Sequence, residues 1–392
     1  MPWTISMVIR NLSNIDSEKY DFVVIGAGLY GAVMARELTD CGRKVLVLEK
    51  RDHIAGNCFT EEINGITVHK YGPHIFHTDN EEVWRYVNRF ARFREFINSP
   101  AAVSGGRRYT LPFNLDTFTQ LYGITDPAEA EQLIRSQAEE ALKGKEPENL
   151  EEQAISMVGT GIYETLIKGY SEKQWGRECR DLPASIIKRI RISFDHSTNY
   201  FEDRYQGIPA EGYTYMIEEM LKGIKVITGC DYDAAGRCGK EDDISGRLIY
   251  TGPIDRYYSY CFGRLEYRSV RFEETRLAGS GDYQDRAVVN YTDISVPYTR
   301  VTEHRHFDPE NAGKQDKLTI ITKEYPESCN GINEPMYPVC DENNLRLYKK
   351  YRDLADADPK VHFGGRLGTF RYLDMDDVVA SALADSRTLI EE

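Results

Sequence analysis

The chain has 392 residues, of which 41% are hydrophobic and 29% are charged, and its formal net charge is -14. The length predicts two or three subdomains, and the negative charge argues against nucleic acid as a partner. The negative charge does not exclude a small anionic ligand. The attraction between one arginine and a phosphate about 4 Å away is about 4 kcal/mol at an effective dielectric of about 20, before desolvation.

The composition also bears on the compartment of the protein. No apolar run approaches the roughly 20 residues that span a bilayer, so we expect no membrane association. Residues 1–19 lack the apolar core of a signal peptide and are predicted to be a polar N-terminal extension. The eight cysteines show no CxxC spacing. Reduced thiols, a cytoplasmic protein and no metal site are the expectation.

Residues 20–49 predict a dinucleotide-binding unit: an apolar strand, a glycine-rich turn, a helix and a second apolar strand. Gly26 allows the tight turn, Gly28 lets backbone amides approach a pyrophosphate, and Gly31 lets the helix pack closely on the strand. Glu49 ends the second strand at the spacing that places a carboxylate on an adenosine ribose. The glycine motif alone would be weak evidence, but here the two strands, the helix and the terminal acid occur with it in the expected order.

The rest of the first segment, to residue 79, carries candidate cofactor and catalytic residues. The loop with Lys50, Gly56 and Asn57 is predicted to run along the cofactor, and a hairpin follows it. His74 and His77 then flank a short apolar run. They lack the third ligand of a metal site. The two histidines could simply be bonded to the backbone, or they could face the cofactor. The nearby cofactor loop favours a position facing the cofactor.

Residues 80–183 predict a mainly helical domain distinct from the nucleotide-binding fold. We expect helices over 81–90, 114–121, 126–142 and 151–167, and a short strand at 107–111. Residues 168–183 form a long polar connection that contains Tyr170 and Trp175. Two aromatic residues beside a glycine favour a mobile lid loop over a solvated turn.

The remainder alternates between the nucleotide-binding fold and a second sheet. Residues 184–255 predict a helix and strands that return to the first sheet, with Gly252 close to the cofactor. Residues 256–345 predict an antiparallel substrate domain, with strands at 266–273, 286–291, 298–303 and 317–322. Residues 346–392 end in a strand, a glycine-rich loop and a helix that begins near Asp374. This pattern predicts that the chain returns to complete the dinucleotide pocket.

Six short motifs occur in order along the chain. They lie at residues 71–78, 169–175, 199–201, 298–300, 335–338 and 365–375. Together they resemble the prokaryotic UDP-galactopyranose mutase family, from about Asp21 to Leu383. The resemblance implies an α/β fold: a Rossmann-like FAD-binding domain with an inserted helical domain and an antiparallel β-sheet domain.

The resemblance also implies an activity. Family members are FAD enzymes that interconvert UDP-galactopyranose and UDP-galactofuranose, without net redox, through a covalent adduct of the sugar's anomeric carbon with N5 of reduced FAD. They serve cell-surface polysaccharide biosynthesis and are commonly cytoplasmic homodimers. Two alternatives stay open: an FAD-dependent oxidoreductase of the amine-oxidase type, and a UDP-sugar-binding flavoprotein sensor without turnover.

Roles carry over from the family by motif. Arg189 and Arg300 should hold the diphosphate as catalytic residues, with His74 and His77 beside the flavin and sugar. Without the resemblance, the arginines would be interpreted as structural ion pairs. The implied substrate-binding residues are Tyr170, Ser171, Trp175, Arg189, Tyr200, Asn290, Arg300, Tyr337, Tyr372 and Asp374. The implied cofactor-binding residues are Gly26, Gly28, Gly31, Glu49, Lys50, Gly56, Asn57, Gly252, Gly365, Arg366, Asp374 and Met375.

The chain departs from the family pattern at a few positions. Ala55 stands where a glycine is usual, which adds a methyl group to the flavin loop. Arg191 replaces a proline and Ser193 replaces a second arginine, which changes the charges around Arg189. Met336 stands where an aromatic residue is common, next to the expected uridine and sugar contacts.

Overall fold

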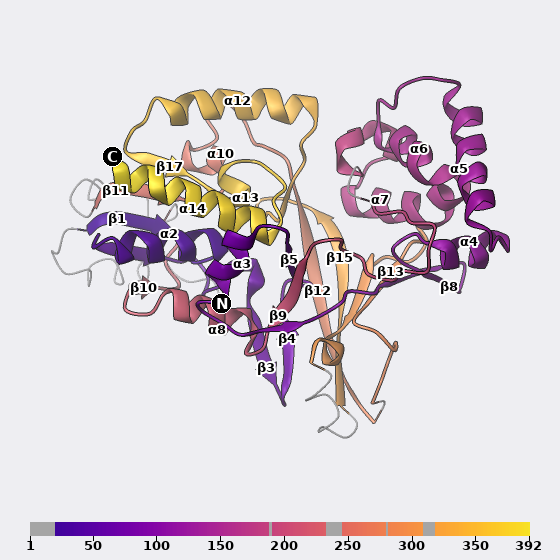
Figure 1. Cartoon of the computed structure of the whole chain (residues 1–392). Coiled ribbons are helices and arrows are strands. Elements are labelled where there is room, and N and C mark those ends of the chain that lie inside the picture. Colours follow the sequence, from indigo (N-terminus) through magenta and orange to yellow (C-terminus); the bar gives the residue numbers. More distant parts are fainter. Residues whose placement is uncertain (1–19, 188–189, 233–244, 280, 309–317) are drawn as a thin grey trace.

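Two large sheets and a group of helices organise the chain (Figure 1). The computed structural model describes residues 20–187, 190–232, 245–279, 281–308 and 318–392. The predicted N-terminal extension, 1–19, lies outside these ranges. Figure 1 shows helices α4 to α7 gathered on one side of the long strands β12 and β15, with the parallel sheet and its helices on the other side.

The first sheet is parallel throughout, in the order β10-β2-β1-β11-β17. Its strands are β1 (Tyr20–Ile25), β2 (Val45–Leu48), β10 (Lys225–Ile227), β11 (Ser245–Tyr250) and β17 (Val361–Phe363). Alternate residues of β1 and β2 face a core that includes helices α2 (Leu29–Asp40), α8 (Gly212–Met220) and α14 (Met375–Glu391), and the others face a smaller core on the opposite side. Apolar residues on both faces explain why these strands show no polar alternation in the sequence. The predicted Rossmann-like unit is confirmed.

The second large sheet has the order β16-β12-β15-β14-β13-β7-β8. Its strands are β7 (Ala101–Ser104), β8 (Arg107–Thr110), β12 (Tyr267–Ala278), β13 (Val288–Tyr291), β14 (Arg300–Glu303), β15 (Leu318–Ser328) and β16 (Tyr337–Pro338). Neighbours pair antiparallel except β7 and β13. Across β14, Arg300 is in register with Asn290 on one side and Glu324 on the other. This register places three polar residues together on neighbouring strands.

The region predicted to be mainly helical also supplies strands. Its residues 101–110 form β7 and β8 at the edge of the large sheet, and β6 (Phe93–Glu95) joins β5 (Phe76–Thr78) and β9 (Tyr205–Pro209) in a three-stranded sheet. The hairpin of β3 (Thr60–Ile63) and β4 (Ile66–His69) is as predicted, with positive φ angles of 51° at Asn64 and 76° at Gly65. Positive φ at both turn residues suits an Asn-Gly hairpin.

The helical group contains α4 (Leu115–Tyr122), α5 (Pro127–Leu142), α6 (Leu150–Ile162), a single π-helical turn η2 (Tyr163–Ile167) and α7 (Lys168–Trp175). Asn114 and Thr117 form a reciprocal capping box, and Asp126 caps α5 just before Pro127. The predicted lid loop over 168–183 is wrong for its first half, because α7 continues the helix to Trp175. Its polar sequence misled the prediction, because one of the polar side chains, Lys173, is bonded to main-chain carbonyl groups of a hairpin of the second sheet.

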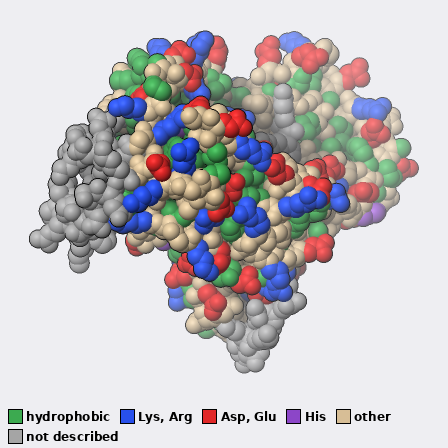
Figure 2. Space-filling view, turned by 60° about the vertical axis from the view of Figure 1, so that its left-hand side comes forward, with side chains coloured by type: hydrophobic (Ala, Val, Ile, Leu, Met, Phe, Trp, Pro, Cys, Tyr) green, Lys and Arg blue, Asp and Glu red, His purple; other side chains and the backbone are tan. Residues whose placement is uncertain are grey.

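The remaining helices are short or lie on the first sheet. They are α3 (Glu81–Val87), α10 (Ile254–Tyr257), α12 (Glu342–Asp356), α13 (Gly365–Gly368) and the 3-10 turns η1 (Gly56–Cys58), η3 (Cys179–Asp181), η4 (Ala184–Ile186) and η5 (His304–Phe307). None of the helices in the described ranges combines the length and apolar character needed to traverse a bilayer. On the face drawn in Figure 2, lysines and arginines are interspersed with acidic residues, so the net negative charge is not gathered there in one acidic patch.

Candidate active site

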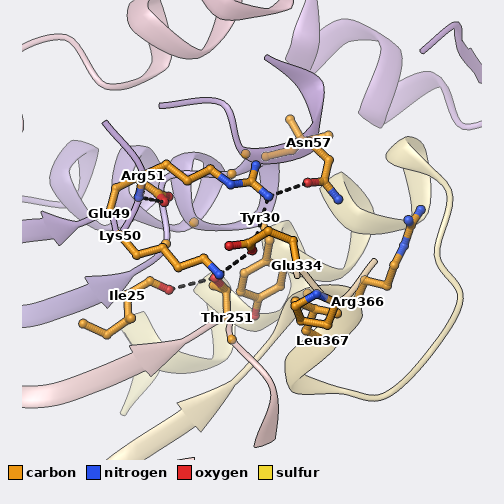
Figure 3. Close-up of a pocket in the computed structure, with 18 of the residues that line it drawn as sticks. Ile25, Tyr30, Glu49, Lys50, Arg51, Asn57, Thr251, Glu334, Arg366 and Leu367 are labelled. Carbon is orange, nitrogen blue, oxygen red and sulfur yellow. Dashed lines mark hydrogen bonds and ion pairs between the residues drawn. The ribbon is translucent and has the colours of Figure 1, made fainter. Parts of the chain in front are cut away.

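A cavity lies at the carboxyl edge of the parallel sheet, where the ends of its strands meet (Figure 3). Segments far apart in the sequence line it, as expected for a ligand site of a parallel α/β sheet. The predicted cofactor residues that line it are Gly26, Gly28, Gly31, Glu49, Lys50, Gly56, Asn57, Gly252, Gly365, Arg366 and Met375. Asp374 is not part of the lining; it stands at the N-cap of α14.

The glycine loop has the geometry that its spacing predicts. Gly26 adopts a left-handed φ of 103°, and a Cβ on Gly31 would lie 2.0 Å from the Gly26 carbonyl oxygen. Gly28 is the N-cap of α2, and a Cβ there would approach Gly56 Cα to 3.8 Å. Among the described residues no side chain caps α2. Its first N–H groups are therefore free to bind an anion such as a pyrophosphate.

Glu49 is fixed beneath the glycine loop. Its carboxylate accepts hydrogen bonds from the amides of Ala27 (2.7 Å) and Arg51 (2.9 Å), and its side chain is buried. Glu49 also lines the cavity, as its predicted role on a ribose requires. Lys50 forms an ion pair with Glu334, which comes from a distant loop (Figure 3). Arg51 and Glu334 were not predicted, because a basic or acidic residue in a polar loop carries no distinguishing signal.

The residues present therefore fit a dinucleotide cofactor. The loop at Gly28 and Gly56 has room that larger side chains would fill, and an anion-binding helix end faces the same space. Ala55 adopts a left-handed φ of 71° and is fully buried. A glycine, which the resemblance leads one to expect at this position, would suit this conformation because it carries no Cβ.

A second cluster surrounds Arg300 at the start of β14. The guanidinium donates to the Tyr170 hydroxyl (3.0 Å) and to Asn290 Oδ1 (3.3 Å). Its Nη1 lies 3.6 Å from Glu324 Oε2. Burial acts to lower the pKa of Arg300, but Tyr170 and Glu324 outweigh it and raise the pKa further. The guanidinium is therefore a permanent cation.

Glu324 is the member of this cluster that sequence reasoning missed. It is 7% exposed, and among the described residues its Oε1 has no hydrogen-bond partner. Burial raises the pKa of Glu324, and the charge of Arg300 opposes that rise. An acid within a predicted strand gives no hint of what lies across the sheet, so only the register of β14 and β15 reveals this contact.

Arg366 connects the cluster to the cofactor cavity. Its guanidinium carbon lies 5.3 Å from the ring centre of Tyr337 and 5.0 Å from that of Tyr372, and the two rings stack 5.9 Å apart. Arg366 also lines the cavity, so the aromatic pair borders the cofactor site. Tyr372 is 43% exposed and Tyr200 is 37% exposed. The side chains of Tyr200 and Tyr372 can therefore be reached by a ligand from solvent.

The two predicted catalytic histidines differ in position. His74 lines the cofactor cavity and donates from Nδ1 to the Gly72 carbonyl (2.9 Å). Burial lowers the pKa of His74 to about 4, so the imidazole is neutral near pH 7 and its Nε2 is an acceptor. His77 is not in the cavity lining; it donates to Asp203 Oδ2 (2.9 Å) and stacks on Phe201.

The other predicted residues are placed as follows. Arg189 lies outside the described residues. Ser171 is buried on α7, and Trp175, at the end of that helix, packs against the core of the helical group. Arg191 donates to the Asn199 carbonyl and pairs with Glu202, while Ser193 bonds Asp195. Met336 is buried and lines the cofactor cavity.

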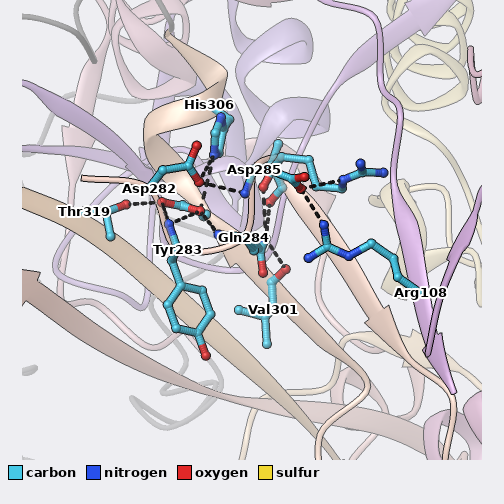
Figure 4. A network of polar contacts seen from close by, with 11 residues as sticks. Arg108, Asp282, Tyr283, Gln284, Asp285, Val301, His306 and Thr319 are labelled. Carbon is cyan, nitrogen blue, oxygen red and sulfur yellow. Dashed lines mark hydrogen bonds and ion pairs between the residues drawn. The ribbon is translucent and has the colours of Figure 1, made fainter. Parts of the chain in front are cut away.

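A third polar network, away from the cavity, contains Asp282, Glu303 and His306 (Figure 4). The nitrogen and carboxylate oxygens lie within 4.8 Å of one another, as metal ligands would. However, the Glu303 carboxylate already accepts hydrogen bonds from the amides of Tyr283 and Gln284 and from the Thr319 hydroxyl. His306 Nε2 lies 3.4 Å from Asp282 Oδ1 and 3.3 Å from Glu303 Oε2, so the geometry suits a protonated imidazole between two carboxylates.

The parallel sheet and its glycine loop define a Rossmann-like dinucleotide-binding domain, and an arginine–tyrosine cluster adjoins its cavity. Comparison with known proteins agrees. The profile of the UDP-galactopyranose mutase family matches residues 165–372, and that of the NAD(P)-binding Rossmann-like domain matches residues 24–90. The chain belongs to the UDP-galactopyranose mutase family and is an isomerase.

Individual relatives cover nearly the whole chain. A probable UDP-galactopyranose mutase of Klebsiella pneumoniae is 40% identical over 93% of both chains. The dTDP-fucopyranose mutase of Escherichia coli is 39% identical over 94% of this chain and 98% of its own length. The crystal structure of a reduced UDP-galactopyranose mutase has a TM-score of 0.76, covering 95% of this chain and 94% of that chain at 15% identity, and thus shows the same fold.

Proposed function

We propose that this isomerase binds FAD in the cavity at the edge of the parallel sheet and, with the flavin reduced, interconverts UDP-galactopyranose and UDP-galactofuranose. The observation that carries the proposal is the position of Arg366, which lines the cofactor cavity and also lies over Tyr337 and Tyr372. Reduced FAD, when bound, supplies the nucleophile that displaces UDP from the anomeric carbon of the sugar.

Arg300 would bind the diphosphate. Its fork of N–H donors matches paired phosphate oxygens, and its charge stabilises UDP as it leaves. Glu324 and Asn290 hold the guanidinium from the two neighbouring strands, so the group needs little reorganisation during the reaction. Arg189 is proposed as the second diphosphate ligand.

The aromatic residues would complete the substrate site. Tyr170 would stack on uracil, with Ser171 and Trp175 of the same helix on the nucleotide side. Tyr200, Tyr337 and Tyr372 would line the diphosphate and sugar, aided by Asn290 and Asp374. The exposure of Tyr200 and Tyr372 supports this assignment, because large apolar rings left open to solvent suit a ligand contact.

His74 would accept a hydrogen bond at Nε2 from the cofactor or from a sugar hydroxyl. Its neutral state and the bond from Nδ1 to Gly72 support this role. His77 is not in the cavity lining, and it is proposed to lie beside the flavin and sugar with its ring oriented by the hydrogen bond to Asp203. We further propose that the protein acts as a cytoplasmic homodimer in cell-surface polysaccharide biosynthesis.

A relative that is 39% identical is named as a dTDP-fucopyranose mutase. The two nucleotide sugars, which differ in the sugar and in the base, should therefore be compared directly as substrates. Purified protein would be incubated with UDP-galactopyranose or dTDP-fucopyranose, with and without dithionite, and the products separated by chromatography. We expect a UDP-furanose only under reduction. Exclusive turnover of dTDP-fucopyranose would reassign the substrate. Oxygen consumption with an amine, and no turnover of either nucleotide sugar, would overturn the proposal.

A further inference from the structure

Helix α7 is docked on the turn between β13 and β14 by one lysine. The Lys173 ammonium lies among four main-chain carbonyl groups of that turn. It donates to the oxygens of Tyr291 (2.7 Å), Asp293 (2.9 Å), Val296 (3.0 Å) and Tyr298 (3.0 Å). An ammonium has three N–H donors, so at least one N–H is shared between two of the four oxygens, and all of its hydrogen-bonding capacity is directed at this turn.

The turn connects two proposed substrate ligands. Asn290 is on β13 and Arg300 begins β14, so the carbonyl groups that surround Lys173 lie between them in the chain. The helix carries a third, Tyr170, three residues before Lys173. Residues three apart lie on the same face of a helix, so both side chains reach toward the hairpin. Tyr170 meets the Arg300 guanidinium at 3.0 Å.

Two further contacts show that this docking is close. A Cβ on Gly169 would lie 2.2 Å from the Thr292 carbonyl oxygen, so a larger residue would separate the helix from the turn. The Thr292 hydroxyl donates to the Thr165 carbonyl (2.9 Å). Arg268 holds the end of α7 from another direction, with its Nε 2.8 Å from the Gln174 carbonyl. Arg268 is on β12 and does not touch the β13–β14 turn.

This partly buried position is unfavourable for a lysine unless the carbonyl groups replace the hydrogen bonds that its ammonium would make to water. Burial lowers the pKa of Lys173 to about 8, and the charge of Asp293 opposes this effect. A buried ammonium is tolerated where its donors are all satisfied. An apolar residue of similar length would fill the space but would leave four carbonyl oxygens without this donor.

We propose that Lys173 is a positioning residue for the nucleotide-sugar site: its ammonium docks the helix that carries Tyr170 against the hairpin that carries Asn290 and Arg300. The inference rests on the proposed function, because the three residues matter together only if they bind one ligand. Lys173 itself touches main-chain oxygens and not the reacting atoms, so its effect reaches the ligand through Tyr170 and Arg300.

The test compares Lys173→Met with Lys168→Met in the cofactor-loaded protein. Lys168 is on the same helix, but its ammonium pairs with Glu164 at the surface, away from the carbonyl groups that bind Lys173. UDP affinity would be measured by calorimetry, together with KM, kcat and the visible absorption of the flavin. For Lys173→Met we expect at least a tenfold weaker UDP affinity and a similar rise in KM. The flavin spectrum should be retained and kcat should fall less than threefold. Lys168→Met should stay within twofold of wild type.

An unchanged UDP affinity in Lys173→Met would overturn the inference, and so would equal losses of UDP and flavin binding, which would indicate a general structural role. Should Lys173→Met fail to fold, Gly169→Ala decides, because its single methyl group meets the Thr292 carbonyl and leaves the lysine in place. We expect about fivefold weaker UDP binding, and unchanged binding would refute the inference. If wild-type protein neither binds UDP nor turns over a nucleotide sugar, the proposed function itself fails.

Discussion

Replacing Arg300 tests the role of the cluster around it and also separates function from stability. Arg300→Ala removes the cation 3.6 Å from the Glu324 carboxylate. At that separation and an effective dielectric of about 20, the attraction is about 5 kcal/mol before desolvation. Removing one partner of a buried ion pair destabilises a protein by about 3–5 kcal/mol, because the other charge stays buried and unpaired. We therefore expect a large loss of stability and near-complete loss of turnover.

A second substitution isolates the two effects. In Arg300→Ala/Glu324→Gln the unpaired charge is gone, so most of the lost unfolding free energy should return, while turnover should stay low because the diphosphate ligand is still absent. Urea unfolding, followed by tryptophan fluorescence, and chromatographic turnover measure the two quantities. If the double variant is no more stable than Arg300→Ala, the pair is not coupled. If it recovers turnover, Arg300 is not the diphosphate ligand.

The stability deficit of Arg300→Ala should also depend on pH, and the pKa of Glu324 fixes the direction of that dependence. Burial already raises the pKa of Glu324 while Arg300 opposes the rise, so removing Arg300 raises it further. A carboxyl group whose folded-state pKa is raised loses stability as the pH rises from its unfolded pKa through the folded one. The deficit of Arg300→Ala should therefore grow between pH 5 and pH 8, and a deficit that shrinks over this range would contradict the argument.

Two further predictions concern the glycine loop and the histidine network. Gly31→Ala places a Cβ 2.0 Å from the Gly26 carbonyl oxygen, so the variant should lose stability and should be purified without bound flavin. Gly28→Ala has space for its Cβ in the unliganded fold, so this variant should lose only flavin affinity. Thermal unfolding measures the stability of both variants, and visible absorption measures their flavin content. Burial acts to lower the pKa of His306, but Glu303 and Asp282 outweigh it and raise the pKa. The stability that wild type has over His306→Gln should be full below about pH 6.5 and decline as the pH rises through the folded-state pKa. A difference that is constant from pH 6 to 9 in denaturant titrations would show that no extra proton is held there.

Local signals in the sequence were sufficient for several parts of the molecule. The glycine spacing, the apolar strands on either side and the acid at Glu49 act within one βαβ unit, so their geometry follows from short-range chemistry. The cap at Asn114 and the Asn64–Gly65 turn are equally local, and the helix and the hairpin that they belong to occur where predicted. The return of the chain at Gly365 to the cavity followed from a second glycine-rich strand and loop.

Prediction was weaker where polar residues pack against distant segments. The long polar run, with two aromatic residues beside a glycine, predicts a loop over 168–175, yet this segment is helix α7. Periodicity detects helices that bury apolar side chains. It does not detect one whose inner face bonds to main-chain carbonyl groups, as Lys173 does.

The sequence by itself determined the Rossmann-like dinucleotide-binding unit, and its motifs indicated the family. Only the tertiary structure decided which side chains meet at the proposed substrate site, because those contacts depend on strand register and helix docking. Glu324 faces Arg300 through the pairing of β14 with β15, and Lys173 reaches the hairpin turn across more than a hundred residues of chain. Contacts of this kind are set when the elements pack together, and no spacing along the chain encodes them.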